Sequence, residues 1–339
     1  MSDMPEPERE AFIRLDPPGF FIRHPPPPHE LDGFITHDEE LFQTIHMGAA
    51  EVDVEKWQLV VSGLVEQPYA LTLEELRHMP SKTITAFHEC YGSPLVPPTK
   101  ALWRIGNVTW TGVPLSTLLA RAKPKPEGRF VWSEGLDRGS FAGVEADRYQ
   151  KDLPIEKAMA EEVLVAYEMN GRPLGRKRGG PVRLVVSGWF GTNSTKWLCK
   201  LFVQEGRAPG PFSTNFYNET VVFSDGNEVV RPVWKVQVNS MIVKPGPDSV
   251  MEGPNVEVEG WAWSYDGVES VSISSDDGKS WNECEVDARK GYSWQKFRAR
   301  LELEPGHYTL MARATSIEGT TQPLEKARNH VHRVSIRIT

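Results

Sequence analysis

A run of positive charge lies in the middle of an acidic chain. From Arg172 to Lys200 the sequence has basic residues and no acidic residue, although the whole chain carries a formal charge of −8. Glycine-rich turns and one apolar strand separate these charges, and such a pattern predicts a pocket for a small anion. The basic residues of the run are Arg172, Arg176, Lys177, Arg178, Arg183, Lys196 and Lys200.

Charge alone leaves two other interpretations of this run open. A surface that binds duplex nucleic acid usually makes its whole domain basic, whereas this chain is acidic overall. A solvated basic face is the simpler alternative, since charged side chains usually lie in water. We therefore expect no nucleic-acid partner and favour the anion pocket.

Cys90 is the second feature that can do chemistry. It stands in the sequence FHECYGSP, between the extended run Lys82–Phe87 and a glycine turn, where a thiolate can reach a metal ion or a substrate. A buried small residue is the alternative, because cysteine is among the most buried residue types. Cys199 and Cys284 lie inside strand-like patterns and are expected in the core.

Other cysteine chemistry has little support in the sequence. For a zinc site, His88, Glu89 and Cys90 are too close together to converge from an extended strand, and no second pair such as C-x-x-C exists. A cysteine protease would need one of nine histidines as its base, and no local pattern provides an oxyanion hole. The serine-hydrolase elbow, the phosphate-binding loop and the dinucleotide fingerprint are also absent from the sequence.

The elements that position these residues are expected to form two domains behind an N-terminal arm. A chain of 339 residues usually makes two domains. Residues 1–35 are rich in proline and predict an extended arm that lies over the body or is partly disordered. Residues 36–231 alternate short strands and helices without a regular strand–helix–strand repeat. Residues 232–339 contain β-strand patterns and turns.

Several elements of residues 36–231 have clear local signals. Thr72-Leu73-Glu74-Glu75 is a capping box, which predicts a short helix that stops at Pro80. Val113–Ala122 predicts another helix, with Pro114 near its first turn. Strands are expected at Trp57–Val61, Val163–Tyr167, Val182–Val186 and Trp197–Val203.

The C-terminal domain is expected to be an all-β sandwich of immunoglobulin type. Short β runs such as NVEVEGWAW and HYTLMARATS are separated by turns such as Asp277-Gly278 and Pro305-Gly306. The fold class is therefore α+β, with a mixed α/β domain followed by the sandwich. Aromatic residues expected in its core or at an interface are Trp261, Trp263, Trp281 and Trp294.

Bulk composition predicts a soluble cytoplasmic protein without a membrane partner. No run approaches the ~20 apolar residues that span a bilayer. The acidic, proline-rich N-terminus has neither the pattern of a secretory leader nor a twin-arginine pair. The three cysteines are odd in number and far apart, so a disulfide framework is not expected.

The chain resembles the sulfite oxidase family of molybdopterin enzymes over nearly all of its length. The segments AYEMNG, GPVRLVVSG and KWL, at their spacings, carry the most specific part of the resemblance. WTGVPLSTLLARA resembles the family's helix after the cysteine loop, SEGLD a later turn, and FITHDEELFQTIH the N-terminal segment that usually ends in Arg-Asn-His. GWAWS and SSDDGKSW resemble the family's immunoglobulin-like dimerisation domain. The resemblance implies a haem-free, bacterial-type member with a molybdenum–molybdopterin cofactor.

The resemblance also assigns roles to single residues. It makes Cys90 the thiolate ligand of molybdenum, and a soft ligand suits this metal. It makes Tyr217 the active-site tyrosine, whose phenol can donate a hydrogen bond to an oxygen ligand of the metal or to substrate. The residues implied for the pterin and its phosphate are Phe42, Gln43, Thr44, Ile45, His46, Asp137, Arg178, Arg183, Ser194, Thr195 and Lys196. The anion pocket inferred from charge and the implied pterin site are thus the same stretch.

Departures from the family pattern concern the substrate. Sulfite-oxidising members hold this dianion with arginines, and Thr44 stands where the first of them is usual. The cysteine loop usually reads Cys-Ala-Gly-Asn followed by arginines, but here it is CYGSPL, with Ser93, Pro94 and Leu95. Gln295 stands in place of the dimerisation-domain arginine. Since charge-assisted pairs are the strong ones, a dianion site without these cations would be weak.

We therefore predict a homodimeric molybdopterin oxidoreductase that transfers an oxygen atom at a molybdenum ion held by Cys90. The alternative is that Arg104, Arg23 or His88 fills the space of the missing cations. Two reactions therefore remain open: oxidation of a sulfite-like oxyanion, and reduction of a neutral S-oxide or N-oxide. The sequence has no c-type haem motif, so electrons would pass to an external carrier such as a cytochrome. The rival from another class is a non-catalytic protein that binds or carries molybdopterin.

Overall fold

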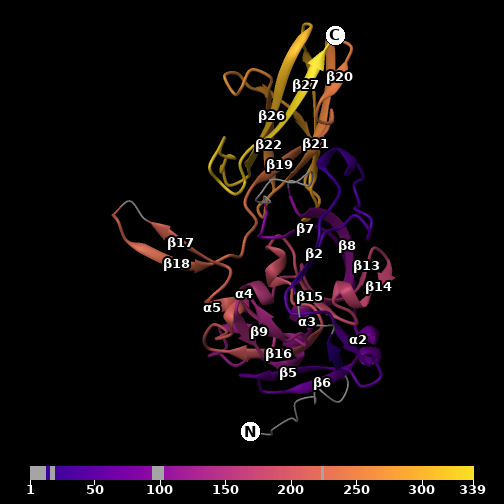
Figure 1. Cartoon of the computed structure of the whole chain (residues 1–339). Coiled ribbons are helices and arrows are strands. Elements are labelled where there is room, and N and C mark those ends of the chain that lie inside the picture. The colour runs from indigo at the N-terminus through magenta and orange to yellow at the C-terminus, as the bar shows by residue number, and fades with distance from the viewer. Residues whose placement is uncertain (1–12, 16–19, 94–102, 223–224) are drawn as a thin grey trace. The chain divides into compact units, whose positions relative to one another are not determined.

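The computed structural model describes residues 13–15, 20–93, 103–222 and 225–339 (Figure 1). The chain packs as two units, each assembled from three stretches of sequence. The first unit contains Met1–Arg23, Gln43–Ile84 and Thr109–Trp234, and the second contains His24–Phe42, Thr85–Val108 and Lys235–Thr339. The boundary therefore falls inside two strands, β7 (Lys82–Glu89) and β8 (Ile105–Pro114).

The first unit contains a mixed sheet with the strand order β12–β9–β16–β5–β6. β16 runs parallel to β5, and the other neighbouring strands are antiparallel. Leu59 and Val61 on β5 and Leu201 and Val203 on β16 are fully buried, so these central strands form the core of the sheet. The strands are β5 (Gln58–Gly63), β6 (Tyr69–Thr72), β9 (Phe130–Gly135), β12 (Gln150–Pro154) and β16 (Leu198–Gln204).

A second sheet has the order β14–β13–β8–β7, and β15 also pairs with β13. Every residue of Val163–Tyr167 is buried, which explains why this strand appears in the sequence as a continuous apolar run. The strands not yet given are β13 (Val163–Met169), β14 (Arg172–Pro173) and β15 (Arg183–Val186). The strands expected near residues 57, 163, 182 and 197 are confirmed.

Both helices expected from the sequence are present. In α2 (Leu73–His78) the Glu75 amide donates to Thr72 Oγ1 at 3.2 Å and the Thr72 amide donates to the Glu75 carboxylate at 2.8 Å, which completes the capping box. α3 (Leu115–Ala122) begins directly after Pro114 and buries one apolar face. The shorter helical turns are η1 (Pro28–Glu30), α4 (Ile155–Ala158), η2 (Arg176–Arg178), η3 (Gly191–Asn193) and α5 (Pro211–Thr214). In the described part of the chain, no helix has the length and apolar character needed to cross a membrane.

Strand pairs hold the described parts of the N-terminal arm. β1 (Ile13–Leu15) pairs with β4 (Ala50–Val52), and β2 (Phe21–Arg23) pairs with β3 (Gln43–Ile45). β3 contains Gln43, Thr44 and Ile45, three of the residues predicted to contact the cofactor, so its pairing with β2 ties the arm to them. Two hairpins complete the unit: β10 (Gly139–Phe141) with β11 (Val144–Ala146), and β17 (Asn218–Val222) with β18 (Glu228–Pro232), the latter extending away from the sheets (Figure 1).

The second unit contains an all-β sandwich, as expected. One sheet has the order β19–β21–β25–β24 and the other β20–β27–β26–β22–β23. Their apolar side chains form one core, with Val258, Phe297, Leu310 and Ile336 among its buried members. The strands are β19 (Asn239–Lys244), β20 (Ser249–Met251), β21 (Asn255–Trp263), β22 (Val268–Ser274), β23 (Asn282–Glu283), β24 (Glu285–Val286), β25 (Gln295–Glu302), β26 (Gly306–Ser316) and β27 (His332–Ile338). The immunoglobulin type of the sandwich stays a prediction.

Three of the four tryptophans expected in the sandwich core are buried. Trp261 and Trp294 stack at 4.7 Å between ring centroids, and Trp263 packs edge-on against Trp103 at 6.4 Å. Trp281 is half-buried, and the Arg313 guanidinium lies 4.0 Å from its ring centroid. The tryptophans therefore serve as packing residues in this unit.

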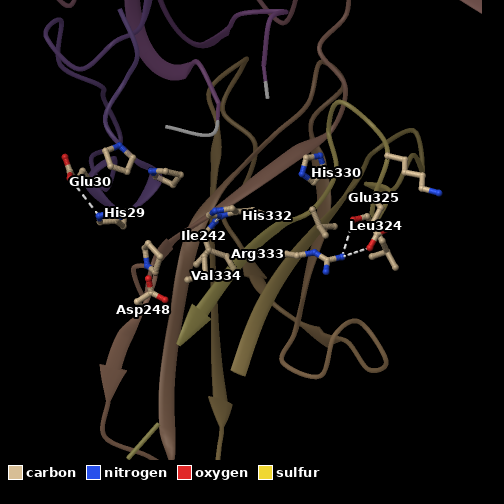
Figure 2. A pocket seen from close by; sticks show the side chains of 15 residues that line it. His29, Glu30, Ile242, Asp248, Leu324, Glu325, His330, His332, Arg333 and Val334 are labelled. Atoms are coloured by element: carbon tan, nitrogen blue, oxygen red, sulfur yellow. Dashed lines mark hydrogen bonds and ion pairs between the residues drawn. The ribbon is translucent and has the colours of Figure 1, made fainter. Parts of the chain in front are cut away.

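A pocket of about 820 Å³ lies in the second unit and includes His332 in its wall (Figure 2). The Ile242 amide donates to His332 Nδ1 at 2.9 Å, so this nitrogen is unprotonated in the neutral ring. Burial lowers the pKa of His332 to about 4, with a smaller contribution from His330. Protonation of His332 would therefore oppose the folded state.

This pKa makes a prediction about acid stability. The folded pKa lies below the unfolded value of about 6.5, so the unfolded state binds the proton first, and stability is lost as the pH falls from about 6.5 towards 4. We expect His332→Gln to reduce this loss by up to about 1 kcal/mol per pH unit. The difference is measured as the free energy of unfolding by denaturant, for wild type and His332→Gln, at pH 7 and pH 5. His307→Gln, which removes an exposed histidine of β26, is the control; an equal pH response in wild type and His332→Gln would contradict the assignment.

Candidate functional site

Hydrogen bonds join β3 to the basic run in the first unit. Gln43 is buried, and its Nε2 donates to the carbonyl of Lys177 at 2.5 Å. The ammonium group of Lys196 donates to the carbonyl of Thr44. Gln43 and Thr44, both predicted to contact the cofactor, are thus hydrogen-bonded to two separate segments of the basic run, one at Lys177 and one at Lys196.

The glycine turn at residues 178–180 packs tightly on the segment around Lys196. The Trp197 amide donates to the Gly179 carbonyl at 3.0 Å, and the Trp197 indole donates to the Arg176 carbonyl at 2.9 Å. Gly179 has a φ of +91°, and a Cβ there would lie 2.6 Å from Cβ of Lys196. Only glycine fits this position, because both the backbone conformation and the close approach exclude a side chain.

Arg183 organises the same turn from inside. Its guanidinium is buried and donates to the carbonyls of Arg178 at 3.1 Å, Ser194 at 3.2 Å and Leu184 at 3.5 Å. It also lies 4.9 Å from the ring centroid of Trp110. Burial, with a smaller contribution from the nearby charge of Arg178, lowers the pKa of Arg183 to about 9. A cation held by carbonyls adds positive potential to the turn without cancelling its charge.

Asp137, Ser194 and Thr195, which are also predicted for the pterin, are buried polar residues in loops near β9 and β16. The Val186 amide donates to Ser194 Oγ at 3.1 Å, and the hydroxyls of Thr195 and Ser133 lie 2.7 Å apart. Asp137 is also buried, and its carbonyl accepts from the Tyr149 amide at 3.0 Å. These contacts hold the backbone around residues 194–196 in one shape.

Tyr217 and His46 form a pair within an aromatic cluster. The Tyr217 oxygen and His46 Nε2 lie 2.5 Å apart. Phe141 and Phe212 pack against the His46 ring, with centroids at 4.7 Å and 5.2 Å, and the neighbouring Ile45 is buried. Tyr217 has a φ of +58°, a conformation that is unusual for a residue other than glycine and is often found at functional sites.

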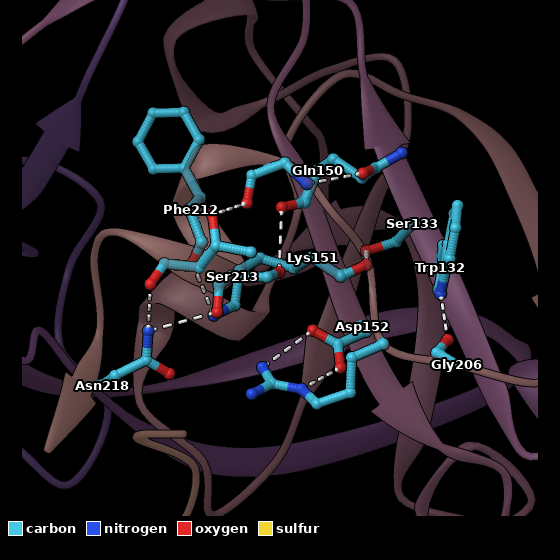
Figure 3. A network of polar contacts seen from close by, with 12 residues as sticks. Trp132, Ser133, Gln150, Lys151, Asp152, Gly206, Phe212, Ser213 and Asn218 are labelled. Atoms are coloured by element: carbon cyan, nitrogen blue, oxygen red, sulfur yellow. Dashed lines mark hydrogen bonds and ion pairs between the residues drawn. The ribbon is translucent and has the colours of Figure 1, made fainter. Parts of the chain in front are cut away.

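A polar network of β12 holds the segment that leads to Tyr217 (Figure 3). Lys151 Nζ donates to the Phe212 carbonyl at 2.9 Å and lies 5.8 Å from the ring centroid of Tyr217. The Asp152 carboxylate accepts two hydrogen bonds from Arg207, at 2.7 Å and 3.1 Å. Burial lowers the pKa of Lys151 to about 8, Asp152 opposes this shift, and Arg207 adds to it. The network therefore places a buried amine near the tyrosine.

Cys90 follows the end of β7 in the second unit. It is half-buried, whereas Cys199 and Cys284 are buried as expected. The Cys90 amide donates to the Arg104 carbonyl at 2.9 Å, and the Cys90 carbonyl accepts from the Ser93 amide at 3.3 Å. These bonds close a tight turn directly after the strand. Pro94 and Leu95, predicted to mark the altered cysteine loop, lie outside the described residues.

The side chains near this turn have structural contacts of their own. Arg104 is buried, and its guanidinium donates to the Gly92 carbonyl at 2.7 Å. The His88 ring stacks on Phe42 with centroids 5.5 Å apart and an angle of 11° between the planes. Phe42, predicted for the pterin, thus packs on the strand that leads to Cys90.

Gln295 is part of the sandwich framework. Its Oε1 accepts from the Val268 amide at 2.8 Å, and its Nε2 donates to the carbonyls of Val268 and Asp287, each at 3.0 Å. The residue is buried on β25. The amide therefore joins β25 to the start of β22, which lies in the other sheet, and to the residue that follows β24.

Two family models match this chain in sequence. Residues 46–212 match the oxidoreductase molybdopterin binding domain, and residues 230–336 match the Mo-co oxidoreductase dimerisation domain. The chain belongs to the sulfite oxidase family of molybdopterin oxidoreductases. Molybdenum bound to molybdopterin is the cofactor of this family and of this domain.

Individual relatives agree with this assignment. The chain is 29% identical to mitochondrial sulfite oxidase of Mus musculus, covering 94% of this chain and 62% of that protein. It is 30% identical to the Homo sapiens protein, covering 90% and 60%, and 28% identical to the NADPH nitrate reductase of Aspergillus niger, covering 79% and 33%. The chain thus spans about six tenths of the length of the sulfite oxidases it matches.

A solved structure shares the fold of the whole chain. The sulfane dehydrogenase SoxCD of Paracoccus pantotrophus is similar with a TM-score of 0.79 and 27% identity, and the match covers 99% of this chain and 87% of that one. This similarity supports the expected fold of a mixed α/β domain followed by a β-sandwich.

The residues present fit the anionic end of the family's cofactor. Arg183, Arg178 and the segment of Lys196 are joined by carbonyl hydrogen bonds, and Gly179 leaves room for the two turns to pack closely. A buried arginine surrounded by carbonyls keeps the region positive, which favours an anion such as a phosphate. We refer below to residues 176–183 with residues 194–197 as the basic cradle.

The structure separates some residues that the sequence groups together. Arg172 is exposed on β14, and Lys200 is buried within β16 with its ammonium 4.5 Å from the Phe202 ring centroid. These ends of the basic run are therefore outside the cradle. Phe42 and Cys90 belong to the second unit, whereas the other predicted cofactor residues belong to the first.

Two residues with contacts to the site have at most a weak signal in the sequence. Lys151 is one of two charged residues in a short strand and gives only a weak sign, a lysine among buried positions. Arg328 donates to the Cys90 carbonyl at 2.8 Å from a loop near the C-terminus. Its surrounding sequence, PLEKARNH, has no motif that points to the cysteine.

The cradle makes a prediction about Gly179. We expect Gly179→Ala to destabilise the protein by about 3 kcal/mol, because the left-handed conformation costs about 1 kcal/mol and the overlap with Lys196 adds about 2 kcal/mol. Gly171→Ala is the matched control, since Gly171 also has a positive φ (+71°) but nothing within 4 Å of an added Cβ. Equal losses in denaturant unfolding would show that the close packing does not matter.

Proposed function

We propose that this protein is a catalytically active molybdenum oxidoreductase that transfers an oxygen atom at a metal ligated by Cys90. The hydrogen bond between His46 and Tyr217 is the observation that carries the catalytic part of this proposal. A protein that only carries molybdopterin would have no need to hold a tyrosine in a left-handed conformation inside an aromatic cluster.

Cys90 is proposed as the metal ligand because of its exposure and its setting. It is half-buried in a tight turn, while the other two cysteines are buried in strands or at their edges. A partly accessible thiolate at the end of a rigid strand suits a soft metal centre. When bound, the cofactor supplies the two-electron redox chemistry of the reaction, and the protein supplies binding and orientation.

The basic cradle is proposed to hold the cofactor's phosphate. Arg178 and Lys196 would contact the anion directly, with Ser194, Thr195 and Asp137 as polar neighbours, while Gln43, Thr44, Ile45, His46 and Phe42 would line the pterin. Arg183 would act mainly through the turn, because its guanidinium already donates to carbonyls. Charge-assisted hydrogen bonds to phosphate are strong enough to make this contact the main anchor.

Tyr217 is proposed to present its phenol proton to the substrate. If His46 Nε2 carries a proton and donates it to the Tyr217 oxygen, the phenol proton is available for a second hydrogen bond. The aromatic cluster and the strained backbone fix the direction of this group. A positioned phenol of this kind can stabilise charge that develops on an oxygen during transfer.

The substrate is proposed to carry less charge than sulfite. Thr44 has no positive charge, the Gln295 amide is used by the sandwich, and Arg104 donates to the Gly92 carbonyl. The SoxCD relative is named a sulfane dehydrogenase, which supports a sulfur compound other than sulfite. A neutral or weakly charged substrate therefore fits best, either a sulfur compound that is oxidised or an S-oxide or N-oxide that is reduced.

Electron transfer and assembly are also proposed. Electrons would be exchanged with a separate carrier such as a cytochrome. A homodimer would form through the domain at residues 230–336, which matches a dimerisation domain model. The cytoplasmic location expected from the sequence stays a prediction.

The ligand role of Cys90 can be tested by metal content. We expect Cys90→Ser to lose most of the bound molybdenum while circular dichroism and the melting temperature stay close to those of wild type, because a hydroxyl is a poor substitute for a soft thiolate. Cys284→Ala is the control, since this buried cysteine lies in the sandwich. Full molybdenum occupancy in Cys90→Ser would contradict the ligand role.

The proposed reaction can be tested with a dye-coupled substrate panel on metal-loaded protein. We expect a weakly charged sulfur compound or an S-oxide to have a higher kcat/KM than sulfite. On that substrate, Tyr217→Phe should lower kcat by about 100-fold at unchanged molybdenum content. Tyr149→Phe removes a hydrogen bond from the same cluster to Thr192 and should keep kcat within a few-fold. Efficient sulfite oxidation would overturn the substrate assignment, and full activity of Tyr217→Phe would overturn the role of the phenol.

A further inference from the structure

Arg328 binds three consecutive residues of the cysteine turn. It lies in the segment between β26 and β27 of the second unit. Its Nε donates to the Tyr91 carbonyl at 2.9 Å, one Nη donates to the Cys90 carbonyl at 2.8 Å, and the other donates to the Glu89 carboxylate at 2.9 Å. The guanidinium also lies 5.0 Å from the Tyr91 ring centroid. One side chain thus contacts the residue before Cys90, Cys90 itself and the residue after it.

Glu89 fixes the other side of this contact. Its side chain is completely buried, and its second carboxylate oxygen accepts from the indole of Trp263 at 2.8 Å. A buried carboxylate needs both a counter-charge and hydrogen-bond donors. Arg328 supplies the charge and Trp263 supplies the additional donor. The guanidinium is therefore held in one place by a partner that has little freedom to move.

These bonds fix the direction of the Cα–Cβ bond of Cys90. The peptide group before Cys90 is fixed because the Cys90 amide donates to the Arg104 carbonyl at 2.9 Å. The peptide group after Cys90 is fixed because its carbonyl accepts from Arg328. Since the two peptide planes on either side of a Cα define the direction of its Cβ, both bonds together set the direction in which the thiol leaves the backbone.

We propose that Arg328 is a positioning residue that holds the thiol of Cys90 in the orientation required for metal binding. This inference rests on the proposed ligand role of Cys90. Lysine cannot replace arginine fully, because a single ammonium lacks the planar fork that donates in three directions at once. The same segment also contributes Leu324, Glu325, Lys326 and His330 to the wall of the pocket in Figure 2, so it packs within the sandwich unit as well as on the cysteine turn.

A purely structural ion pair is the competing explanation. Such a pair would lower the melting temperature when removed but would leave the accessibility of the thiol unchanged well below that temperature. A positioning role predicts a local change at Cys90 in the folded protein. The two explanations therefore differ in a chemical property of one sulfur atom.

The experiment compares Arg328→Met and Arg328→Lys with wild type in the full-length chain. In metal-free protein, alkylation of Cys90 by iodoacetamide is followed by mass spectrometry at a temperature where every variant is folded. We expect the rate to rise by about tenfold in Arg328→Met and by less in Arg328→Lys, because release of the turn exposes the thiol through local opening. In metal-loaded protein, we expect lower molybdenum occupancy and a shifted thiolate-to-metal absorption band. Unchanged alkylation, occupancy and absorption in Arg328→Met would overturn the proposal.

Controls separate this proposal from the one on which it rests. Arg300→Met removes an exposed ion pair with Glu257 at 2.8 Å and should change none of these measurements. Glu89→Gln keeps an acceptor for Trp263 but removes the charge, and it should raise the alkylation rate as Arg328→Met does, which covers the case in which Arg328→Met fails to fold. If metal loading does not protect Cys90 of wild type from alkylation, the ligand role itself fails, whereas the effect of Arg328 on the turn is still read from the metal-free protein.

Discussion

A buried guanidinium that is surrounded by main-chain carbonyls is the constraint on which the basic cradle depends. Arg183 can leave water only if its donors find acceptors, and those acceptors are carbonyls of the turn at Arg178 and of the segment at Ser194. The burial of one side chain therefore holds two loops at a fixed separation. Carbonyls are dipoles without net charge, so the region stays cationic and remains suited to a phosphate.

At the cysteine turn, too, arginine side chains donate to main-chain carbonyls. The carbonyl of Cys90 accepts from Arg328, and the carbonyl of Gly92 accepts from Arg104. At both positions an arginine side chain donates hydrogen bonds to main-chain carbonyls, so these cations stabilise the backbone of the turn. The same reasoning applies to Gln295, whose amide bonds to the backbone of Val268 and Asp287.

Features set by neighbouring residues were predictable from the sequence, and features set by distant residues were not. The capping box of α2 involves groups three residues apart, and the strand at Val163–Tyr167 is buried on both faces, so both are visible in a short window. The contact of Arg328 with Glu89 joins residues 239 positions apart, and no local pattern indicates it. The positions of Arg172 and Lys200 outside the cradle depend on strand pairing, which a charge count does not contain.

The division of the chain into interleaved units has a consequence for the order of events during synthesis. The strand that leads to Cys90 packs with residues 235–339, which are synthesised well after residue 90. The turn around the cysteine cannot reach its final shape until Arg328 has left the ribosome, because that residue fixes its carbonyls. Domains often fold as they are synthesised, beginning at the N-terminus, but here the turn at Cys90 waits for Arg328, which lies 238 positions further along the chain. With Cys90 as the proposed metal ligand, insertion of the cofactor would then follow the synthesis of Arg328.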